Sequence, residues 1–275
     1  MRLFVPEYGN YYHFITESVM GLYRTLRDHE KLHTKDCEIW YKGRYAEIIQ
    51  LFSRERIHSV ENIKLIPTDV DTLIHIRPKN HEQWLELRSL RVYLEDMFPR
   101  HDTQQGITVI KRINKRVYTE HADLVRRLSK FDMPVREAIM ETLPFEKQVD
   151  LLRNTRILVG PHGSGETNMM FMPTGSMILE LYPKGFSDRV FRGMALAFGH
   201  HLVELEATRP SVIGRLPSQR VQEYLDHNPW PNREVFVNWK PDRMELGRVL
   251  RDVSSFSIDP NVVIERLEAM LKPLQ

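Results

Sequence analysis

Short apolar runs alternate with amphipathic stretches along most of this chain, and the two patterns predict different elements. Phe14, Val19, Leu22 and Leu26 recur at a helical spacing, whereas short runs rich in Val, Ile and Leu are typical of buried strands. The predicted strands cover residues 37–41, 63–66, 73–76, 107–110, 136–141, 156–159, 177–181 and 201–205. The predicted helices cover residues 12–32, 45–52, 83–98, 121–131, 145–154, 189–198 and 260–271. This alternation predicts an α/β fold with parallel sheets and helices on both faces.

A polar stretch at residues 99–106 separates two series of these elements. A chain of 275 residues also suits two domains of about 100–150 residues each. We therefore predict two Rossmann-like halves with a cleft between them. Asp259 as an N-cap and Pro260 in the first turn predict the start of the last helix.

The composition excludes several classes of protein. A net charge of +2, from 39 basic and 37 acidic residues, gives no general electrostatic case for nucleic acid. Cys37 is the only cysteine, so no disulfide forms within the chain. No apolar run approaches the roughly 20 residues of a spanning helix, and no signal peptide is evident at the start. We expect a cytoplasmic protein without a membrane span.

A glycine-rich segment at residues 157–168 is the strongest indication of a ligand site. It is typical of a buried strand, a tight turn and the start of a helix. Glycine lets the backbone take left-handed angles and approach a ligand closely, and the free N–H groups of a helix start favour an anion. The candidate phosphate-binding residues are His162, Gly163, Ser164, Gly165, Thr167 and Asn168. The alternative is a turn that needs glycine only for packing.

Two arginines follow the predicted strand at residues 107–110. The planar guanidinium groups of Arg112 and Arg116 suit phosphate oxygens, and two of them can neutralise most of a diphosphate. A solvated basic turn is the alternative. We expect these arginines to lie at the same sheet edge as the glycine-rich segment and to face the same ligand.

His13 and Glu17 are four residues apart on the first predicted helix, so they share one face. A carboxylate beside an imidazole can act as a general base or hold the imidazole in its useful tautomer. The alternative is a solvated helix face with Asn10 as its N-cap. The spacing also suits two zinc ligands, but no third ligand stands in a recognisable motif, so we expect no metal.

Two weaker patterns remain as alternatives. Asp69 and Asp71 form a D-x-D motif, which can hold Mn²⁺ or Mg²⁺ by oxygen ligation, or one of them could supply a catalytic base. The segment from His162 is also similar to the oxyanion loop of esterases. That interpretation requires a G-x-S-x-G motif, and the segment at residues 185–189 lacks its second glycine.

Taken in order along the chain, these motifs resemble those of glycosyltransferase family 61, which includes xylosyl- and N-acetylglucosaminyltransferases. The matching elements are N-x-x-H-x-x-x-[D/E] at residues 10–17, Arg112-x-x-x-Arg116, F-x-x-Q at residues 145–148, and the segments 160–168, 171–175 and 180–183. The resemblance covers roughly residues 10–183.

The resemblance implies a GT-B-like fold and an inverting transferase that uses a UDP-sugar without a metal. Residues 1–102 would form the acceptor-binding domain, and residues 103–258 the donor-binding domain. The final helix, within residues 259–275, would pack back on the N-terminal domain. No cofactor is implied, because the UDP-sugar is a substrate. The acceptor would be a hydroxyl group of an oligosaccharide or glycoprotein.

The resemblance also implies roles for individual residues. Arg112, Arg116 and His162 would neutralise the diphosphate, residues 163–168 would supply backbone donors, and Phe145 would lie near the uridine. Inversion requires one base to take the proton of the acceptor hydroxyl. Glu17, oriented or assisted by His13, is the candidate, and Asp69 and Asp71 are its rivals.

The family's common Ala-Gly-Leu after the His-Gly pair is here Ser164-Gly165-Glu166. Where leucine is common, Glu166 places a carboxylate beside the expected phosphate site, and its charge would repel the ligand unless it points away or is paired. Without anchor or disulfides, the chain resembles a compact viral or microbial member. Xylose is the favoured donor sugar, although no single residue identifies it.

Overall fold

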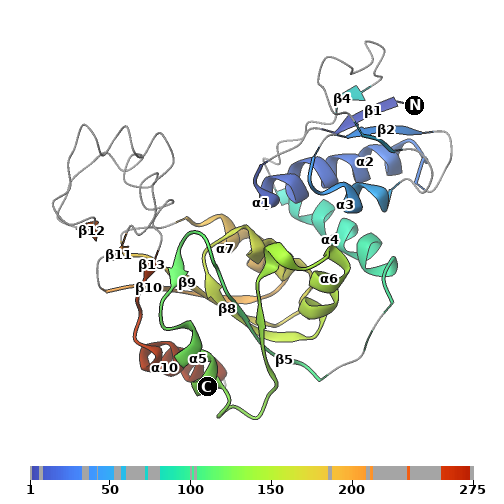
Figure 1. Cartoon of the computed structure of the whole chain (residues 1–275). Coiled ribbons are helices and arrows are strands. Elements are labelled where there is room, and N and C mark those ends of the chain that lie inside the picture. The colour runs from blue at the N-terminus through green and yellow to red at the C-terminus, as the bar shows by residue number, and fades with distance from the viewer. Residues whose placement is uncertain are drawn as a thin grey trace. The chain divides into compact units, whose positions relative to one another are not determined.

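The computed structural model of the chain contains two compact units (Figure 1). It describes residues 2–5, 9–32, 37–41, 43–52, 57–59, 72–73, 81–99, 101, 104–184, 188–208, 211–212, 234–235 and 255–272. Unit 1 comprises Met1–His101 and Pro144–Val149, and unit 2 comprises Asp102–Leu143 and Asp150–Gln275. Residues 144–149 count with unit 1, unlike in the prediction, and the ring of Phe145 packs edge-on against Phe98 at 5.8 Å.

Unit 1 is built on a parallel sheet with the strand order β3-β2-β1-β4. Its strands are β1 (Arg2–Val5), β2 (Glu38–Tyr41), β3 (Ile57–Ser59) and β4 (Thr72–Leu73). The prediction missed β1 and β3. The strand predicted at residues 63–66 lies outside the described residues.

The first helix of unit 1 changes its winding along its length. It runs through α1 (Tyr11–His13), a π-helical segment η1 (Phe14–Val19) and α2 (Met20–Asp28). Its buried side chains are those that predicted a helix, so the prediction is correct except at the C-terminal end. π-Helical segments occur often at functional sites.

Two further helices, α3 (Ala46–Gln50) and α4 (His81–Asp96), complete the described part of this unit.

Unit 2 is built on a five-stranded parallel sheet with the order β10-β9-β8-β5-β7. Its strands are β5 (Gly106–Ile110), β7 (Val135–Ala138), β8 (Thr155–Pro161), β9 (Met177–Tyr182) and β10 (His201–Glu206). All five were predicted, with small differences at their ends. Two α/β units on parallel sheets confirm the predicted GT-B-like class.

Helices cover both faces of this sheet (Figure 1). Those of unit 2 are α5 (His121–Leu128), the 3-10 helices η3 (Met140–Thr142) and η4 (Ser164–Phe171), α7 (Val190–Ala197) and α10 (Pro260–Leu271). Helix α6 (Phe145–Arg153) spans the division between the units. A small mixed sheet contains β6 (Val117–Tyr118), β11 (Ser211–Val212), β12 (Glu234–Val235) and β13 (Ser255–Phe256).

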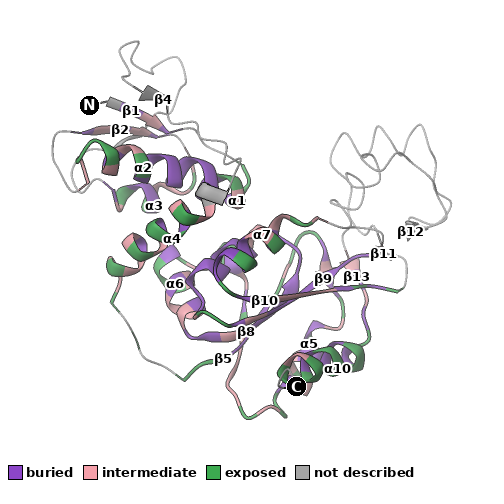
Figure 2. Ribbon diagram, turned by 180° about the vertical axis from the view of Figure 1, so that it is seen from behind, coloured by how far each residue is buried: buried purple, intermediate pink, exposed green. Residues whose placement is uncertain are grey.

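The last helix does not pack as predicted. Val263, Ile264 and Leu267 of α10 lie in the hydrophobic core of unit 2, together with α5 and one face of the central sheet. Figure 2 shows β8 and β9 in the buried colour, whereas α5 and α10 carry an exposed outer face. The Tyr118 hydroxyl also donates to the Ile258 carbonyl at 2.8 Å. The apolar face of α10 is therefore covered within unit 2.

Among the residues that the structure describes, no helix combines the length and the apolar character needed to cross a bilayer.

Candidate functional site

The order of the strands in unit 2 determines where a ligand site can form. From β5 the chain passes to β7 on one side, and later to β8, β9 and β10 on the other side. The sheet therefore changes direction between β5 and β8, which are neighbours. Ligands of open parallel sheets bind at such a switch point, outside the carboxyl ends of the strands. The loops that follow β5 and β8 meet at this edge.

The structure brings the two arginines and the glycine-rich segment together at this edge. Arg116 donates through Nε to the carbonyl oxygen of His162 at 2.9 Å. Arg112 donates through Nε to the Lys115 carbonyl at 2.7 Å, and its Nη1 lies 1.7 Å from where a Cβ on Gly163 would stand. These contacts join the loop after β5 to the loop after β8, as expected if both loops face one ligand.

Arg116 has an unusual backbone conformation. Its φ angle is 53°, in the left-handed region that residues with a Cβ seldom adopt, and its side chain is buried. Such backbone strain costs about 1–3 kcal/mol and occurs preferentially at ligand-binding sites. The hydrogen bond to His162 is one contact that holds the residue in this conformation.

The glycines of the loop act through close approach and not through left-handed angles. Gly163 has a φ of 174°, which is extended backbone, and Gly165 is not among the described residues with positive φ. A Cβ on Gly163 would overlap the guanidinium of Arg112, and one on Gly165 would stand 3.0 Å from Met140. The expectation of left-handed angles is therefore wrong. The backbone does approach other groups closely, but these groups are the side chains of Arg112 and Met140.

The helix after the loop differs from the prediction. It is a 3-10 helix, η4, and the first amide is already engaged because Gly163 donates its N–H to Oε2 of Glu166 at 3.3 Å. The N–H of Glu166 donates in turn to the Gly163 carbonyl at 2.9 Å. One backbone donor that was expected to meet an anionic ligand is thus held by the carboxyl group of Glu166.

The other polar residues of the segment divide into two sets. Ser164 and Gly165 are partly exposed. Thr167 and Asn168 are fully buried, and the Thr167 hydroxyl has no hydrogen-bond partner among the described residues. The sequence predicted that Thr167 and Asn168 reach toward a ligand. Both side chains are buried in the structure, and their ligand role stays a prediction.

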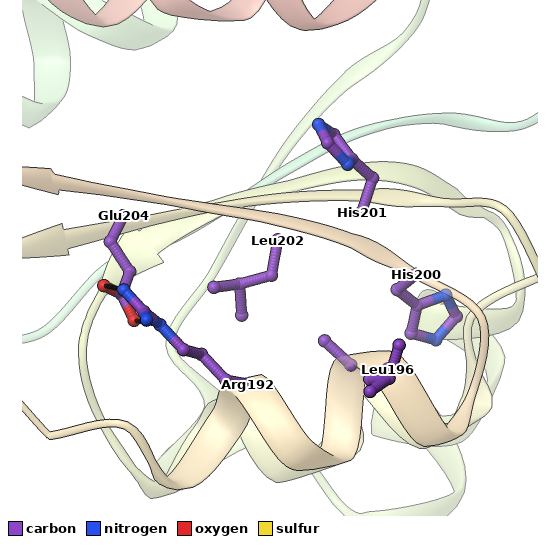
Figure 3. Close-up of a pocket in the computed structure, with 7 residues that line it drawn as sticks. Arg192, Leu196, His200, His201, Leu202 and Glu204 are labelled. Carbon is purple, nitrogen blue, oxygen red and sulfur yellow. Dashed lines mark hydrogen bonds and ion pairs between the residues drawn. The ribbon is translucent and has the colours of Figure 1, made fainter.

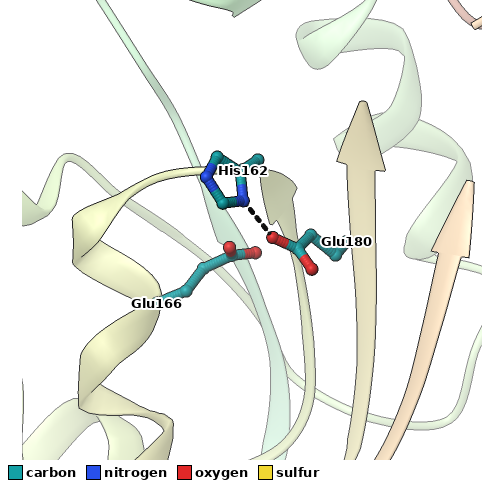
Figure 4. Close-up of side chains that lie close together, drawn as sticks. All are labelled: His162, Glu166 and Glu180. Atoms are coloured by element: carbon teal, nitrogen blue, oxygen red, sulfur yellow. Dashed lines mark hydrogen bonds and ion pairs between the residues drawn. The ribbon is translucent and has the colours of Figure 1, made fainter. Parts of the chain in front are cut away.

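Three buried titratable side chains converge beneath the loop (Figure 4). Nδ1 of His162 and Oε1 of Glu180 are 2.5 Å apart, and the carboxyl group of Glu166 points toward this pair. The His162 ring stacks on Tyr182 at 5.3 Å, and its Nε2 lies 3.9 Å from Oδ2 of Asp188. These contacts together fix the orientation of the His162 ring.

Glu166 and Arg112 both carry shifted pKa values. Burial is the largest cause that raises the pKa of Glu166 well above its ordinary value, and the neighbouring Glu180 raises it further. The Gly163 N–H and Arg112 act in the opposite direction. Burial lowers the pKa of Arg112, while Glu141 and Glu166 raise it. Burial thus disfavours the charged form of both side chains, the guanidinium of Arg112 and the carboxylate of Glu166.

His162, Glu166 and Glu180 are also residue types that bind metals, with one candidate ligand atom of each within 4.8 Å of the others. Two ligands of one ion stand about 3 Å apart when metal–ligand bonds are about 2.1 Å and nearly perpendicular. The 2.5 Å contact between His162 and Glu180 is shorter than this spacing, and it joins the imidazole and the carboxyl group directly. The three side chains therefore form a hydrogen-bonded group of residue types that also bind metals.

Sequence reasoning did not assign Glu180 to the site. Its signal was a glutamate inside the apolar strand Met177–Tyr182, because a charged residue is almost never fully buried unless it is paired. Glu166 was noted only as a departure from the family pattern. The structure places both carboxyl groups beside His162, which links the two residues to the predicted phosphate site.

The predicted catalytic pair of unit 1 is formed. His13 and Glu17 are joined by a contact of 2.6 Å between Nδ1 and Oε1. The His13 side chain is 49% exposed, whereas that of Glu17 is only 9% exposed. Asn10 is the N-cap of this helix and accepts from the Tyr12 N–H at 2.9 Å. The imidazole is therefore the member of the pair that faces solvent.

Other candidate residues receive no support as ligand contacts. Phe145 is 2% exposed and packs against Phe98, so its place near the uridine stays a prediction. Asp69 and Asp71 lie outside the described residues, as do residues 185–187 of the esterase-like alternative. The D-x-D motif is therefore neither supported nor excluded.

A separate cavity of about 370 Å³ lies between α7 and β10 (Figure 3). Arg192 and Glu204 form an ion pair on one side of it, and Leu196 and His200 lie on another. None of the predicted site residues lines this cavity. The candidate donor site is thus defined by the sheet edge and its loops.

Comparison with known sequences finds one matching family model and relatives that share short segments. The family model described as Glycosyltransferase 61 matches residues 11–179. An EGF domain-specific O-linked N-acetylglucosamine transferase from Drosophila melanogaster is 45% identical over 53 residues, which are 19% of this chain and 10% of that protein. The Bos taurus protein of the same name is 29% identical over 84 residues, 30% of this chain and 16% of its own length. The matched segments are thus small parts of both relatives.

Solved structures that this chain resembles include two from E. coli. The E. coli heptosyltransferase WaaC with ADP has a TM-score of 0.46 and 8% sequence identity, and the match covers 83% of this chain and 98% of WaaC. The iron-containing dodecameric glycosyltransferase TibC from enterotoxigenic E. coli has a TM-score of 0.45 and 11% identity, over 98% of this chain and 77% of TibC.

Proposed function

The chain belongs to glycosyltransferase family 61, and we propose that it is an inverting glycosyltransferase that transfers a sugar from a UDP-sugar. The acceptor is a hydroxyl group of an oligosaccharide or glycoprotein. One observation carries the proposal: the loops with Arg112, Arg116 and His162 meet at the switch point of the sheet in unit 2.

The donor diphosphate binds at this edge. Guanidinium groups bind phosphate oxygens through charge-assisted hydrogen bonds, which are about twice as strong as neutral ones. Arg112 and Arg116 supply this charge, and the contacts with Gly163 and His162 fix the loops that present it. The two arginines can offset the charge of a leaving diphosphate, so we propose that transfer needs no metal ion.

The catalytic base belongs to unit 1. Inversion is a single displacement, in which the acceptor oxygen attacks the anomeric carbon, the bond to UDP breaks and a base takes the hydroxyl proton. The exposures of His13 and Glu17 support a division of roles within the predicted pair. His13 takes the proton at Nε2, and the buried Glu17 accepts from Nδ1 and stabilises the imidazolium that forms.

The donor sugar is the least constrained part of the proposal. Xylose is our assignment, and it rests on the family resemblance alone. The fly and bovine relatives are named as N-acetylglucosamine transferases, so UDP-N-acetylglucosamine is the competing donor. Discrimination between these sugars depends on contacts to the ring substituents, which the donor screen below addresses directly.

A thermal-shift screen tests the donor class. UDP, GDP, UDP-xylose, UDP-glucose and UDP-N-acetylglucosamine would each be added with and without EDTA. A ligand at 100 times its Kd stabilises the folded state by about 2.7 kcal/mol. For domains of about 150–250 residues, each kcal/mol raises the Tm by about 2–4 °C. We expect uridine nucleotides to raise the Tm by several degrees, with or without EDTA.

The same screen distinguishes the alternatives. A shift that disappears with EDTA would favour a metal-dependent transferase that uses Asp69 and Asp71. No shift with any uridine nucleotide would contradict the proposed donor site. A non-catalytic UDP-sugar-binding module would show the shift but no release of UDP that depends on an acceptor. UDP release should therefore be measured with the sugar nucleotide that gives the largest shift.

A further inference from the structure

Glu166 is a charged residue of the donor site that the family resemblance does not explain. Two buried carboxyl groups, those of Glu166 and Glu180, lie beside His162. Glu180 accepts from His162 Nδ1 through Oε1, and Glu166 accepts from the Gly163 N–H through Oε2. The other two oxygens, Oε1 of Glu166 and Oε2 of Glu180, are buried and have no hydrogen-bond donor in the described part of the chain.

Two buried carboxylates with unpaired oxygens are unfavourable side by side. Each unpaired oxygen loses its water without compensation, and like charges in a low-dielectric interior repel each other. One proton removes both penalties, because a protonated carboxyl group donates a hydrogen bond to the other. Glu180 already accepts from the imidazole of His162, so the extra proton belongs on Glu166. The direction of the Glu166 pKa shift agrees.

We propose that Glu166 is a positioning residue of the donor site, which as a neutral acid donates a hydrogen bond to Glu180 and thereby fixes His162. This inference rests on the proposed function, because His162 is assigned to the diphosphate of the donor. The neutral acid also keeps a second carboxylate charge away from the anionic ligand. Deprotonation of Glu166 places that charge beside the diphosphate and weakens donor binding.

The charged surroundings of Glu166 come from several elements. They are His162 after β8, Glu180 and Tyr182 on β9, Arg112 after β5, Glu141 of η3, which acts on Arg112, and Asp188, which lies near His162. Arg112 is the cation that favours the ionised form of Glu166, and Glu180 opposes it. The net effect raises the pKa of Glu166, because burial is the largest cause.

The sign of the pH effect follows from this shift. Below its raised pKa, Glu166 is neutral and the site has full affinity for UDP. As the pH rises through that value, Glu166 ionises and the affinity falls. UDP itself titrates, so the informative quantity is the ratio of UDP affinities of Glu166→Gln and wild type. If UDP shifts the Glu166 pKa by one unit, this ratio rises about tenfold between the acidic and alkaline limits.

Three variants give a matched set. Glu166→Gln keeps the shape of the neutral acid and its donor, so its UDP affinity should not follow the Glu166 titration. Glu166→Leu, with the residue common in the family, is also neutral but cannot donate to Glu180. We expect it to bind UDP more weakly than Glu166→Gln at neutral pH. Glu265→Gln makes the same change at an exposed position of α10 and should behave as wild type.

Infrared difference spectroscopy tests the proton without any ligand. Wild type minus Glu166→Gln should show the carbonyl band of a buried carboxylic acid at neutral pH, and wild type minus Glu265→Gln should not. Absence of that band overturns the proposal, as does an affinity ratio that stays constant with pH. A stoichiometric metal ion that wild type holds and Glu166→Gln loses would overturn it in favour of a metal site.

The two arms separate this inference from the proposed function. If wild type binds UDP at no pH, the proposed donor site is wrong, and the role of Glu166 in donor binding is overturned with it. If UDP binds normally but the acid band is absent, the proposed function stands and only the inference about Glu166 is wrong.

Discussion

Arg112 and Gly163 show how close packing at single residues can shape the proposed donor site. The Arg112 guanidinium occupies the space that any side chain at position 163 would need. Burial makes the charged form of this arginine less favourable than in water. A phosphate group would compensate for that loss, because charge-assisted hydrogen bonds replace those to water. In the proposed donor site, this packing positions Arg112 for the diphosphate.

Gly163→Ala should displace Arg112 and weaken UDP binding. The added Cβ would stand 1.7 Å from Nη1 and 2.9 Å from Cζ of Arg112, so the guanidinium must move. Loss of one or two hydrogen bonds to a charged group, at about 1.5–3 kcal/mol each, lowers affinity by roughly tenfold or more. Calorimetric titration with UDP measures this, and Arg112→Ala should give a similar loss.

The stability of the same variants provides the control. The tip of an arginine side chain is flexible, so Gly163→Ala should change the Tm little. Gly9→Ala adds a Cβ that meets no atom within 4 Å and should change neither quantity. If Gly163→Ala binds UDP as tightly as wild type while Arg112→Ala does not, then the position of Arg112 is not set by this contact.

At the residue scale, the sequence predicted which segments lie together but not their individual contacts. Strand order places Arg116 beside the loop at His162, whose carbonyl oxygen it contacts, and helical spacing places His13 beside Glu17. The contact of Glu166 with Gly163 depends on the winding of a 3-10 turn, which no residue pattern reveals. The burial of Glu180 was visible only as a charge within an apolar strand.

At the element scale, α10 shows the limit of a prediction from pattern. Its N-cap and first turn were correctly predicted, since Asp259 accepts from the Asn261 N–H at 2.9 Å. An amphipathic helix does not specify which apolar surface it covers, and the expectation came from the architecture of related folds. The structure pairs α10 with α5, and an ion pair between Lys130 and Glu268 at 2.8 Å accompanies the buried contacts.

Leu267→Ala tests this position of α10. Leu267 is 1% exposed in the core of unit 2, so its truncation should destabilise the protein by about 2–5 kcal/mol. Val262→Ala, on the exposed face of the same helix, should cost less than about 0.5 kcal/mol. Denaturant unfolding measures both. Hydrogen exchange should rise in α5 and β5 for Leu267→Ala, and a rise confined to unit 1 would contradict the observed packing.

At the scale of the whole molecule, each unit carries one half of the proposed reaction. The donor residues Arg112, Arg116 and His162 belong to unit 2, and the pair His13–Glu17 belongs to unit 1. The sequence predicts a division near residue 102, because strand–helix alternation restarts after a polar stretch. It did not predict that residues 144–149 count with unit 1, since that depends on the contact of Phe145 with a distant aromatic ring.

Variants in unit 1 should therefore lose transfer and keep UDP binding. Loss of a general base typically lowers the rate by about 10²–10⁴-fold, and we expect this for His13→Ala and for Glu17→Gln. Because the His13 side chain is half exposed, added imidazole should partly restore the rate of His13→Ala. It should not restore Glu17→Gln, which still contains its imidazole.

Rescue is measured as UDP release in the presence of acceptor. The control is Arg126→Ala, which changes an exposed arginine of α5. If His13→Ala and Glu17→Gln are both fully active, the pair is not the base, and Asp69 or Asp71 becomes the candidate. If only Glu17→Gln is inactive, Glu17 itself takes the proton without help from His13.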